Sequence, residues 1–134
     1  MVTLQVELVS PEKILYSGDA DMVIARTTDG EIAFMTGHAP FIGSLGIGAV
    51  TIRASEGDDV VAAVHEGFVE VTDDRVTVLS DVAELVDDID ATRAQRALER
   101  AEQEKGGAGD DEEAEQEAEA KLRRARLRIE LSGG

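Results

Sequence analysis

The chain of 134 residues contains no cysteine, no tryptophan, two prolines, three phenylalanines and one tyrosine. Without cysteine the protein cannot form a disulfide scaffold or a cysteine-ligated metal site. No apolar run approaches the ~20 residues that would span a bilayer, and the first residues lack the basic and apolar pattern of a secretory signal. We therefore expect a protein on the cytoplasmic side.

Positive charge is also scarce, because 13 lysines and arginines stand against 29 aspartates and glutamates, which gives a net charge of -16. A nucleic-acid backbone is held by clustered basic side chains, so this balance argues against a nucleic-acid binder. Unaided binding to anionic lipid is disfavoured for the same reason. We expect the partner of this chain to be a protein.

The acidic and basic residues separate along the last part of the chain. Residues 110–119 contain seven acidic side chains and no basic one, whereas residues 121–128 contain five basic side chains and no acidic one. The basic run consists of Lys121, Arg123, Arg124, Arg126 and Arg128. Such a run can pair with an acidic surface of this chain or of a partner.

Residues 1–82 have the pattern of short strands separated by turns. Val2, Leu4, Val6 and Leu8 alternate with other residues, which is the period of two of a half-buried strand. Further strands are expected at residues 14–17, 21–27, 31–35, 49–54, 60–65, 67–71 and 76–79, with a loop at residues 36–43. This regular spacing predicts an antiparallel β-sandwich or flattened barrel of about eight to ten strands.

The stretch at residues 66–81 has the pattern of a β-hairpin and lies where the strand patterns of the chain give way to helix patterns. Valines alternate with other residues on both sides of a turn at residues 72–75. Asp73 and Asp74 suit the turn, because aspartate can bond its own backbone and tolerates unusual dihedral angles. Strand patterns precede this hairpin and helix patterns follow it.

Residues 83–134 are expected to form a two-helix αα-hairpin, with helices at about 90–105 and 110–131 joined by a glycine-rich loop. Asp110, with Glu113 three residues later, predicts the start of the second helix. Apolar residues recur every three or four positions as two stripes: Ala91, Ala94, Leu98 and Ala101, and then Ala114, Ala118, Leu122, Ala125 and Ile129. The fold class is therefore α+β, with a β-sandwich domain at residues 1–82 and a helical hairpin at residues 83–134.

The hairpin at residues 67–71 and 76–81 resembles the last sandwich hairpin of the epsilon subunit of the bacterial F-type ATP synthase. Residues 37–40 (Gly-His-Ala-Pro) and 45–48 (Leu-Gly-Ile-Gly) are similar to the central loop and following strand of that family. Residues 33–36 depart from the family pattern, and the acidic connector between the helices matches it poorly. The resemblance rests on the order and spacing of these motifs, together with the two helices that follow.

The resemblance implies a non-catalytic rotor subunit in the central stalk of an F1Fo ATP synthase, at the cytoplasmic face of the bacterial plasma membrane. Its partners would be the gamma subunit, the ring of c subunits, and the alpha and beta subunits of the F1 head. The sandwich would pass torque from the proton-driven ring to the head, while the helices would restrain ATP hydrolysis. Two alternatives remain: a free-standing acidic adaptor that binds an unrelated protein, and a soluble ATP sensor that acts alone.

No residues of the chain predict catalysis or a metal site. The only histidines, His38 and His65, are far apart in sequence, whereas zinc needs three or four ligands with short paired spacings. The many carboxylates are typical of a solvated surface, and none of them is singled out as an acid–base pair. We expect a protein that is not an enzyme by itself and requires no cofactor.

One motif suggests ATP as a regulatory ligand. Ile89, Asp90, Arg93 and Ala94 match the I/L-D-x-x-R-A pattern with which some epsilon subunits bind ATP. By this resemblance Arg93 would address phosphate, Asp90 would accept from an amino or hydroxyl group, and the two apolar residues would contact the base.

Basic residues of the second helix complete that site in the family. Arg126 is in register with one of them, but Leu122 occupies the other position, with Arg123 next to it. The alternative is that Asp90 only caps the first helix while Arg93 pairs with a neighbouring acidic residue.

Overall fold

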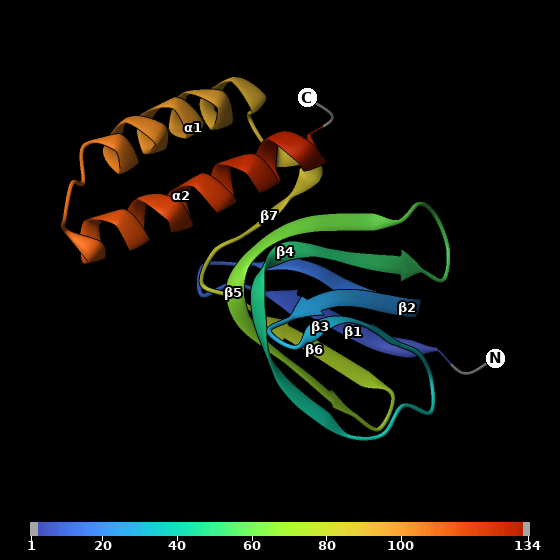
Figure 1. The fold of residues 1–134 in the computed structure, drawn as a ribbon. Helices are drawn as coiled ribbons and strands as arrows, with labels where there is room; N and C mark the ends of the chain where they lie inside the picture. Colours follow the sequence, from blue (N-terminus) through green and yellow to red (C-terminus); the bar gives the residue numbers. More distant parts are fainter. Residues whose placement is uncertain (1–2, 133–134) are drawn as a thin grey trace. The chain divides into compact units, whose positions relative to one another are not determined.

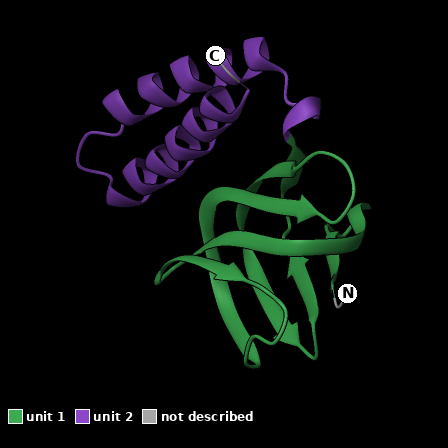
Figure 2. Ribbon diagram, turned by 90° about the vertical axis from the view of Figure 1, so that its right-hand side faces the viewer, with its two compact units in different colours: residues 1–85 green, residues 86–134 purple. Residues whose placement is uncertain are grey.

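The computed structural model describes residues 3–132 and contains two compact units, Met1–Leu85 and Val86–Gly134 (Figure 2). The first unit is built of strands: β1 (Leu4–Val9), β2 (Ile14–Thr27), β3 (Gly30–Phe34), β4 (Phe41–Ala54), β5 (Val60–Thr72), β6 (Arg75–Leu79) and β7 (Ala83–Leu85) (Figure 1). The second unit is helical: a 3-10 turn η1 (Val86–Asp88), α1 (Ala91–Gly106) and α2 (Glu112–Leu131). A β-sandwich followed by two helices is therefore confirmed.

The strands pair in the order β1-β6-β5-β4-β2-β3, and β1 also pairs with β2, so that the sheet curves round and closes on itself. Every pairing is antiparallel except that of β1 with β6, which is parallel. The expectation of a wholly antiparallel sandwich is wrong at this pair. Strands so far apart in sequence give no local signal of their relative direction.

Seven strands in the described residues replace the expected eight to ten. The chain is continuous through Gly18 and Asp19, because residues 17–20 keep their partners on β1, and the two strands expected there form the single strand β2. Likewise β5 runs through the bend at Glu66 and Gly67, where the backbone φ angles are +67° and +146°. Long strands that bend and change partners thus account for the lower number.

Two strand boundaries also differ from the expectation. β4 begins at Phe41, inside the segment expected to be loop, because Phe41 already pairs with Val71 of β5. Ala83 and Leu85 belong to β7, which pairs with the part of β5 that lies beyond the end of β6. The strand unit therefore ends at Leu85, three residues after the expected boundary at residue 82.

The core of the first unit follows the alternation that the sequence shows. Leu4, Val6 and Leu8 of β1 are buried, whereas Val2 lies outside the described residues. The valines of the β5–β6 hairpin also face inward: Val69, Val71, Val76 and Val78 are all buried. Each fully buried aliphatic side chain stabilises the fold by about 1.5–3 kcal/mol, so this alternation fixes which face of each strand points inward.

The helical unit is an antiparallel hairpin in which α1 and α2 lie side by side (Figure 1). Four alanines and one leucine of the expected stripes are buried: Ala94, Ala101, Ala118, Ala125 and Leu122. Alanine lets two helix backbones approach closely but contributes little buried apolar area. None of the described helices is long and apolar enough to cross a membrane.

The helix ends show one correction. Asp111, and not Asp110, caps α2, because its side chain accepts a hydrogen bond from the backbone N–H of Ala114 over 3.1 Å. The helix accordingly begins at Glu112. A carboxylate at either aspartate suits a helix N-terminus, so the sequence did not distinguish two adjacent candidates.

Two ion pairs join the helices near the loop. Lys105 Nζ lies 3.0 Å from Glu119 Oε1, and Lys121 Nζ lies 2.9 Å from Glu104 Oε2. All four side chains are about half exposed, so solvent screens both pairs and each contributes little to stability. The hairpin is therefore held by small residues and weak surface pairs.

Candidate functional site

The start of α1 carries the motif that suggests nucleotide binding. Asp90 is the N-cap of the helix, and its Oδ1 accepts a hydrogen bond from the backbone N–H of Arg93 over 3.0 Å. Its backbone carbonyl accepts a second bond, from the N–H of Ala94 over 2.9 Å. Ile89 precedes the cap, and its N–H donates to the carbonyl of Val86 in the 3-10 turn. Asp90 therefore has a structural task at this position.

The other members of the motif differ in exposure. The Arg93 side chain is exposed and available to an anion, whereas Ala94 is buried. Ile89 is half-buried, as an apolar contact surface would be. Residues 89–94 thus combine an exposed guanidinium with partly covered apolar surface.

Arg126 lies on α2, where it borders an open hollow of about 560 Å³. This hollow is also lined by Glu102, Lys105 and Leu122, among others, but by none of residues 89–94. Neither a hydrogen bond nor an ion pair joins Arg126 to those residues in the described part of the chain. The hollow beside Arg126 therefore does not include the other four candidate residues.

Leu122 occupies the position where the family motif has a second basic residue, and its side chain is buried. It cannot present a charge to a phosphate group. The neighbouring Arg123 is exposed, as is Arg126, so α2 still offers two guanidinium groups to solvent. Lys121 of the same basic run is engaged with Glu104, and Arg124 and Arg128 are half-buried.

A second candidate site lies on the outer face of the sheet, where large apolar side chains are exposed. Strand register places Phe68 of β5 opposite Leu79 of β6, and Leu79 opposite Val9 of β1. Phe68 is 60% exposed and Leu79 is 51% exposed, and Ile42 on the adjacent β4 is 73% exposed. We call Val9, Ile42, Phe68 and Leu79 the apolar patch.

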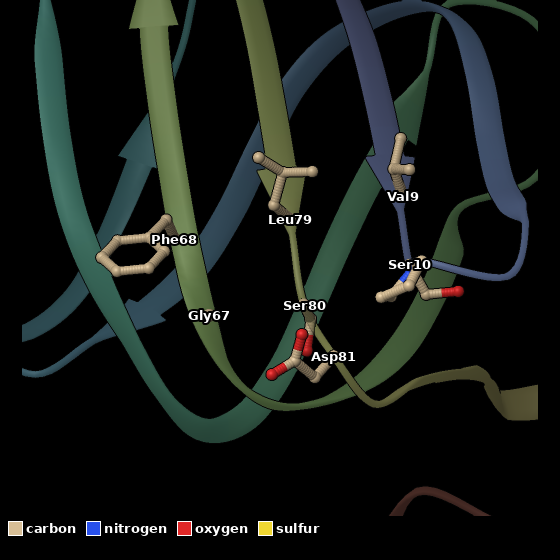
Figure 3. A pocket seen from close by; sticks show the side chains of 8 residues that line it. Val9, Ser10, Gly67, Phe68, Leu79, Ser80 and Asp81 are labelled. Carbon is tan, nitrogen blue, oxygen red and sulfur yellow. The ribbon is translucent and has the colours of Figure 1, made fainter.

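The members of the patch share one face because of the alternation of the strands. Val69 and Val78 point into the core, so Phe68 and Leu79, one residue away along the same strands, point outward. Figure 3 shows Phe68, Leu79 and Val9 in one row across the paired strands β5, β6 and β1. Residues on the solvent face of a sheet are usually polar, so this row requires an explanation.

A hollow of about 380 Å³ adjoins the row (Figure 3). It is lined by Val9, Ser10, Pro11, Gly67, Phe68, Leu79, Ser80 and Asp81. The Ser80 hydroxyl lies 2.5 Å from the carbonyl oxygen of Glu66 and 2.9 Å from that of Val82, and its single proton can be donated to either. A partner side chain could enter this hollow beside the exposed Phe68 ring.

The sequence contained a signal for this patch that residue-type reasoning missed. Once Val69, Val71, Val76 and Val78 are assigned to the core, the alternation assigns Phe68 and Leu79 to the outer face. A phenylalanine and a leucine opposite each other on a solvent face are unusual enough to indicate an interface. Ile42 could not be found in this way, since it was expected in a loop.

Each of the two histidines contacts neighbouring side chains of the strand unit. His65 is buried, and its Nε2 lies 3.3 Å from Glu84 Oε1 on β7. His38 packs its edge on Phe34, with ring centroids 5.0 Å apart. Within residues 3–132 no group of three or more His, Cys, Asp or Glu side chains is arranged to hold a metal ion.

The family models matched by the chain cover both units. Residues 3–86 match the ATP synthase, Delta/Epsilon chain, beta-sandwich domain, and residues 87–133 match the ATP synthase, Delta/Epsilon chain, long alpha-helix domain. The two matches meet within one residue of the division between the strand unit and the helical unit.

Curated relatives named ATP synthase epsilon chain share this sequence closely. The chain is 52% identical to the one from Streptomyces avermitilis over 101 residues, which is 75% of this chain and 82% of that one. It is 42% identical to the one from Halalkalibacterium halodurans over 133 residues, which is 99% of both chains.

Solved structures show the same fold at lower identity. A chain of the Euglena gracilis mitochondrial ATP synthase aligns with a TM-score of 0.82 at 20% identity, covering 95% of this chain and 79% of that one. A chain from the central stalk and c-ring of the Tetrahymena thermophila mitochondrial ATP synthase gives a TM-score of 0.65 at 17% identity, covering 96% of each. Sequence, domain order and fold agree, and the chain belongs to the ATP synthase delta/epsilon chain family.

Proposed function

We propose that this chain is the non-catalytic central-stalk subunit of a bacterial F1Fo ATP synthase, where it couples rotation of the c-subunit ring to ATP synthesis in the F1 head. The observation that carries this proposal is the apolar patch on the outer face of β4, β5, β6 and β1. A rotor subunit needs a firm contact with a neighbouring rotor subunit, and an exposed apolar row beside a hollow offers one.

The energetics favour a covered patch. Fully burying a side chain of the size of Phe68, Leu79 or Ile42 contributes about 1.5–3 kcal/mol, and these three side chains are more than half exposed. Aromatic and aliphatic side chains inserted at the centre of an interface commonly dominate its binding energy. We assign the patch to the contact with the gamma subunit, and another part of the sandwich to the ring of c subunits.

By this proposal the protein is a peripheral member of the complex at the cytoplasmic face of the plasma membrane. It requires no cofactor of its own and no catalytic residue, because ATP is made in the alpha and beta subunits. A free-standing adaptor would have the same fold, but it would not account for homologues that are named as subunits of an ATP synthase.

The helical unit is suited to regulation. Its two helices are joined by weak ion pairs and small residues, so only a modest free energy separates the closed hairpin from an open one. The basic run at residues 121–128 can then pair with acidic surfaces of the alpha and beta subunits and restrain ATP hydrolysis. Replacing Arg123, Arg124, Arg126 and Arg128 together by alanine should raise hydrolysis by the assembled complex, and unchanged hydrolysis would oppose this role.

ATP is proposed as a regulatory ligand of the same unit. The exposed guanidinium of Arg93 and the half-buried Ile89 support such a site, while Asp90 already acts as the helix cap. Because Leu122 supplies no charge, we expect the affinity to be weak.

The function is tested by purifying the tagged chain from membranes solubilised in mild detergent. We expect the subunits of an ATP synthase to accompany the wild-type chain, and to be lost from the Phe68→Ser, Leu79→Ser double variant. Val61→Ser is the matched control, because Val61 lies on the other half of β5 and is only half-exposed. Recovery of the chain alone, or of an unrelated protein, would contradict the proposal.

A further inference from the structure

Asp74 has contacts that reach well beyond the turn in which it lies. Its Oδ1 accepts a hydrogen bond from the backbone N–H of Gly37 over 2.7 Å, across 37 positions of sequence. Its backbone carbonyl accepts another from the N–H of Gln5 over 2.8 Å. One residue of the β5–β6 turn is therefore bonded to the start of β1 and to the loop between β3 and β4.

The conformation of the turn does not by itself require a carboxylate at position 74. Asp73 and Asp74 both have positive φ angles, +51° and +61°, in a two-residue turn that glycine and asparagine suit as well as aspartate does. Of these two aspartates, only Asp74 has a side-chain hydrogen bond in the described part of the chain, and that bond reaches another segment. The carboxylate of Asp74 thus serves a purpose other than forming the turn.

The loop that Asp74 holds leads directly into the apolar patch. After Gly37, His38 packs against Phe34 and Phe41, with centroid distances of 5.0 Å and 6.3 Å. Phe41 begins β4 and pairs with Val71 of β5, and Ile42 follows it as the most exposed member of the patch. The position of Gly37 therefore bears on where β4 begins and how Ile42 is presented.

We infer that Asp74 is a positioning residue for the docking face, and that its carboxylate clamps the β3–β4 loop, and with it the start of β4, to the β5–β6 turn. The backbone carbonyl of Asp74 joins the same turn to β1, and the patch lies on β1, β4, β5 and β6. A docking face that spans four strands binds best when their relative positions are fixed before the partner arrives. This inference rests on the proposed function of the patch.

Three single variants of the full chain distinguish the loss of the Asp74–Gly37 hydrogen bond from a change in the turn itself. Asp73→Gly and Asp74→Gly each replace a positive-φ aspartate by glycine and each remove one negative charge, but only Asp74→Gly removes the acceptor for Gly37. Asp74→Asn removes the same charge, tolerates the same backbone conformation and keeps an oxygen that can accept the bond.

Two measurements are made on each variant: hydrogen exchange of the Gly37 amide by NMR, and binding to an ATP synthase preparation that lacks this subunit. We expect Asp74→Gly to exchange at Gly37 about tenfold faster, the effect of losing one hydrogen bond of about 1.4 kcal/mol, and to bind about tenfold more weakly. Asp73→Gly and Asp74→Asn should resemble the wild type in both measurements.

Equal exchange at Gly37 in the two glycine variants would overturn the clamp. Faster exchange in Asp74→Gly with binding as tight as that of Asp73→Gly would overturn its role in docking. If the wild-type chain itself fails to bind, the proposed function is wrong, and the exchange comparison would still decide whether Asp74 holds the loop.

Discussion

Gly67 lies so close to Leu79 that a Cβ atom placed on Gly67 would stand 2.0 Å from the Leu79 carbonyl oxygen. The φ angle of Gly67 is +146°, in a region that other residues rarely adopt. Because glycine has no side chain, β5 can bend here, between the part that pairs with β7 and the part that pairs with β6. The hollow beside the apolar patch is formed at the same point.

Replacing Gly67 by alanine should therefore destabilise the strand unit strongly. We expect a loss of about 3 kcal/mol or more, because backbone atoms must move apart and the backbone is strained as well. Thermal unfolding followed by circular dichroism should show a transition roughly 15 °C lower or more. Gly46→Ala is the control, since a Cβ atom there would meet nothing within 4 Å, and a similar loss in both variants would contradict this account.

The strand unit should fold without the helices, and β7 should add to its stability. A chain that ends at Leu85 keeps the pairing of Ala83 and Leu85 with β5, whereas one that ends at Asp81 loses it, together with the bond from the His65 N–H to the Val82 carbonyl. We expect both to unfold cooperatively, with the shorter one less stable by about 2 kcal/mol, as the loss of a few backbone hydrogen bonds implies. Urea unfolding measures this difference; equal stabilities would mean that β7 adds nothing, and an unfolded longer chain would contradict the two-unit division.

The parts of the fold that the sequence predicted are those that depend on local pattern. The alternation around Val69 and Val76 correctly indicated a hairpin with its turn at residues 72–75, and the small-residue stripes indicated two helices. The parts that it missed depend on pairing between distant segments. Gly18 looked like a break, but its pairing with Val6 of β1 carries the strand through it.

The candidate sites also differ in whether they depend on local sequence or on contacts between distant segments. The capping role of Asp90 follows from its place directly before a helical pattern, so the sequence alone predicts it. The apolar patch depends on four strands lying next to one another, and the parallel pairing of Val9 with Leu79 could not be read from either strand alone. The clamp of Asp74 on Gly37 is a contact of the same distant kind.

The Lys105–Glu119 ion pair predicts a measurable change in titration. The hydrogen bond and positive charge of Lys105 hold the pKa of Glu119 below its ordinary value, with a smaller effect from Arg123. Because the pKa is lowered in the folded state, the stabilisation is present above the ordinary glutamate pKa and is lost as the pH falls through the lowered value. Carboxyl NMR titration should show the pKa of Glu119 rising in Lys105→Ala but not in Lys121→Ala; no rise in Lys105→Ala would mean that the pair does not form in solution.

ATP should bind weakly and through the helical unit. Titration with ATP, followed by amide shifts of α1 and α2, should give a binding curve that Arg93→Ala weakens by about tenfold or more, as expected for loss of a charged phosphate contact. Arg96→Ala is the control, because Arg96 is also exposed on α1 but lies outside the motif. Equal binding by wild type and Arg93→Ala would exclude the site at residues 89–94.

The most direct test of the account is proton-driven ATP synthesis by membrane vesicles whose ATP synthase lacks this subunit. Adding the wild-type chain should restore synthesis, because we propose that the apolar patch attaches the chain to the rotor. The Phe68→Ser, Leu79→Ser double variant should fold, yet restore at most about a tenth of the rate at the same concentration, since two central interface contacts are lost. Full restoration by the double variant, or none by the wild-type chain, would contradict the account.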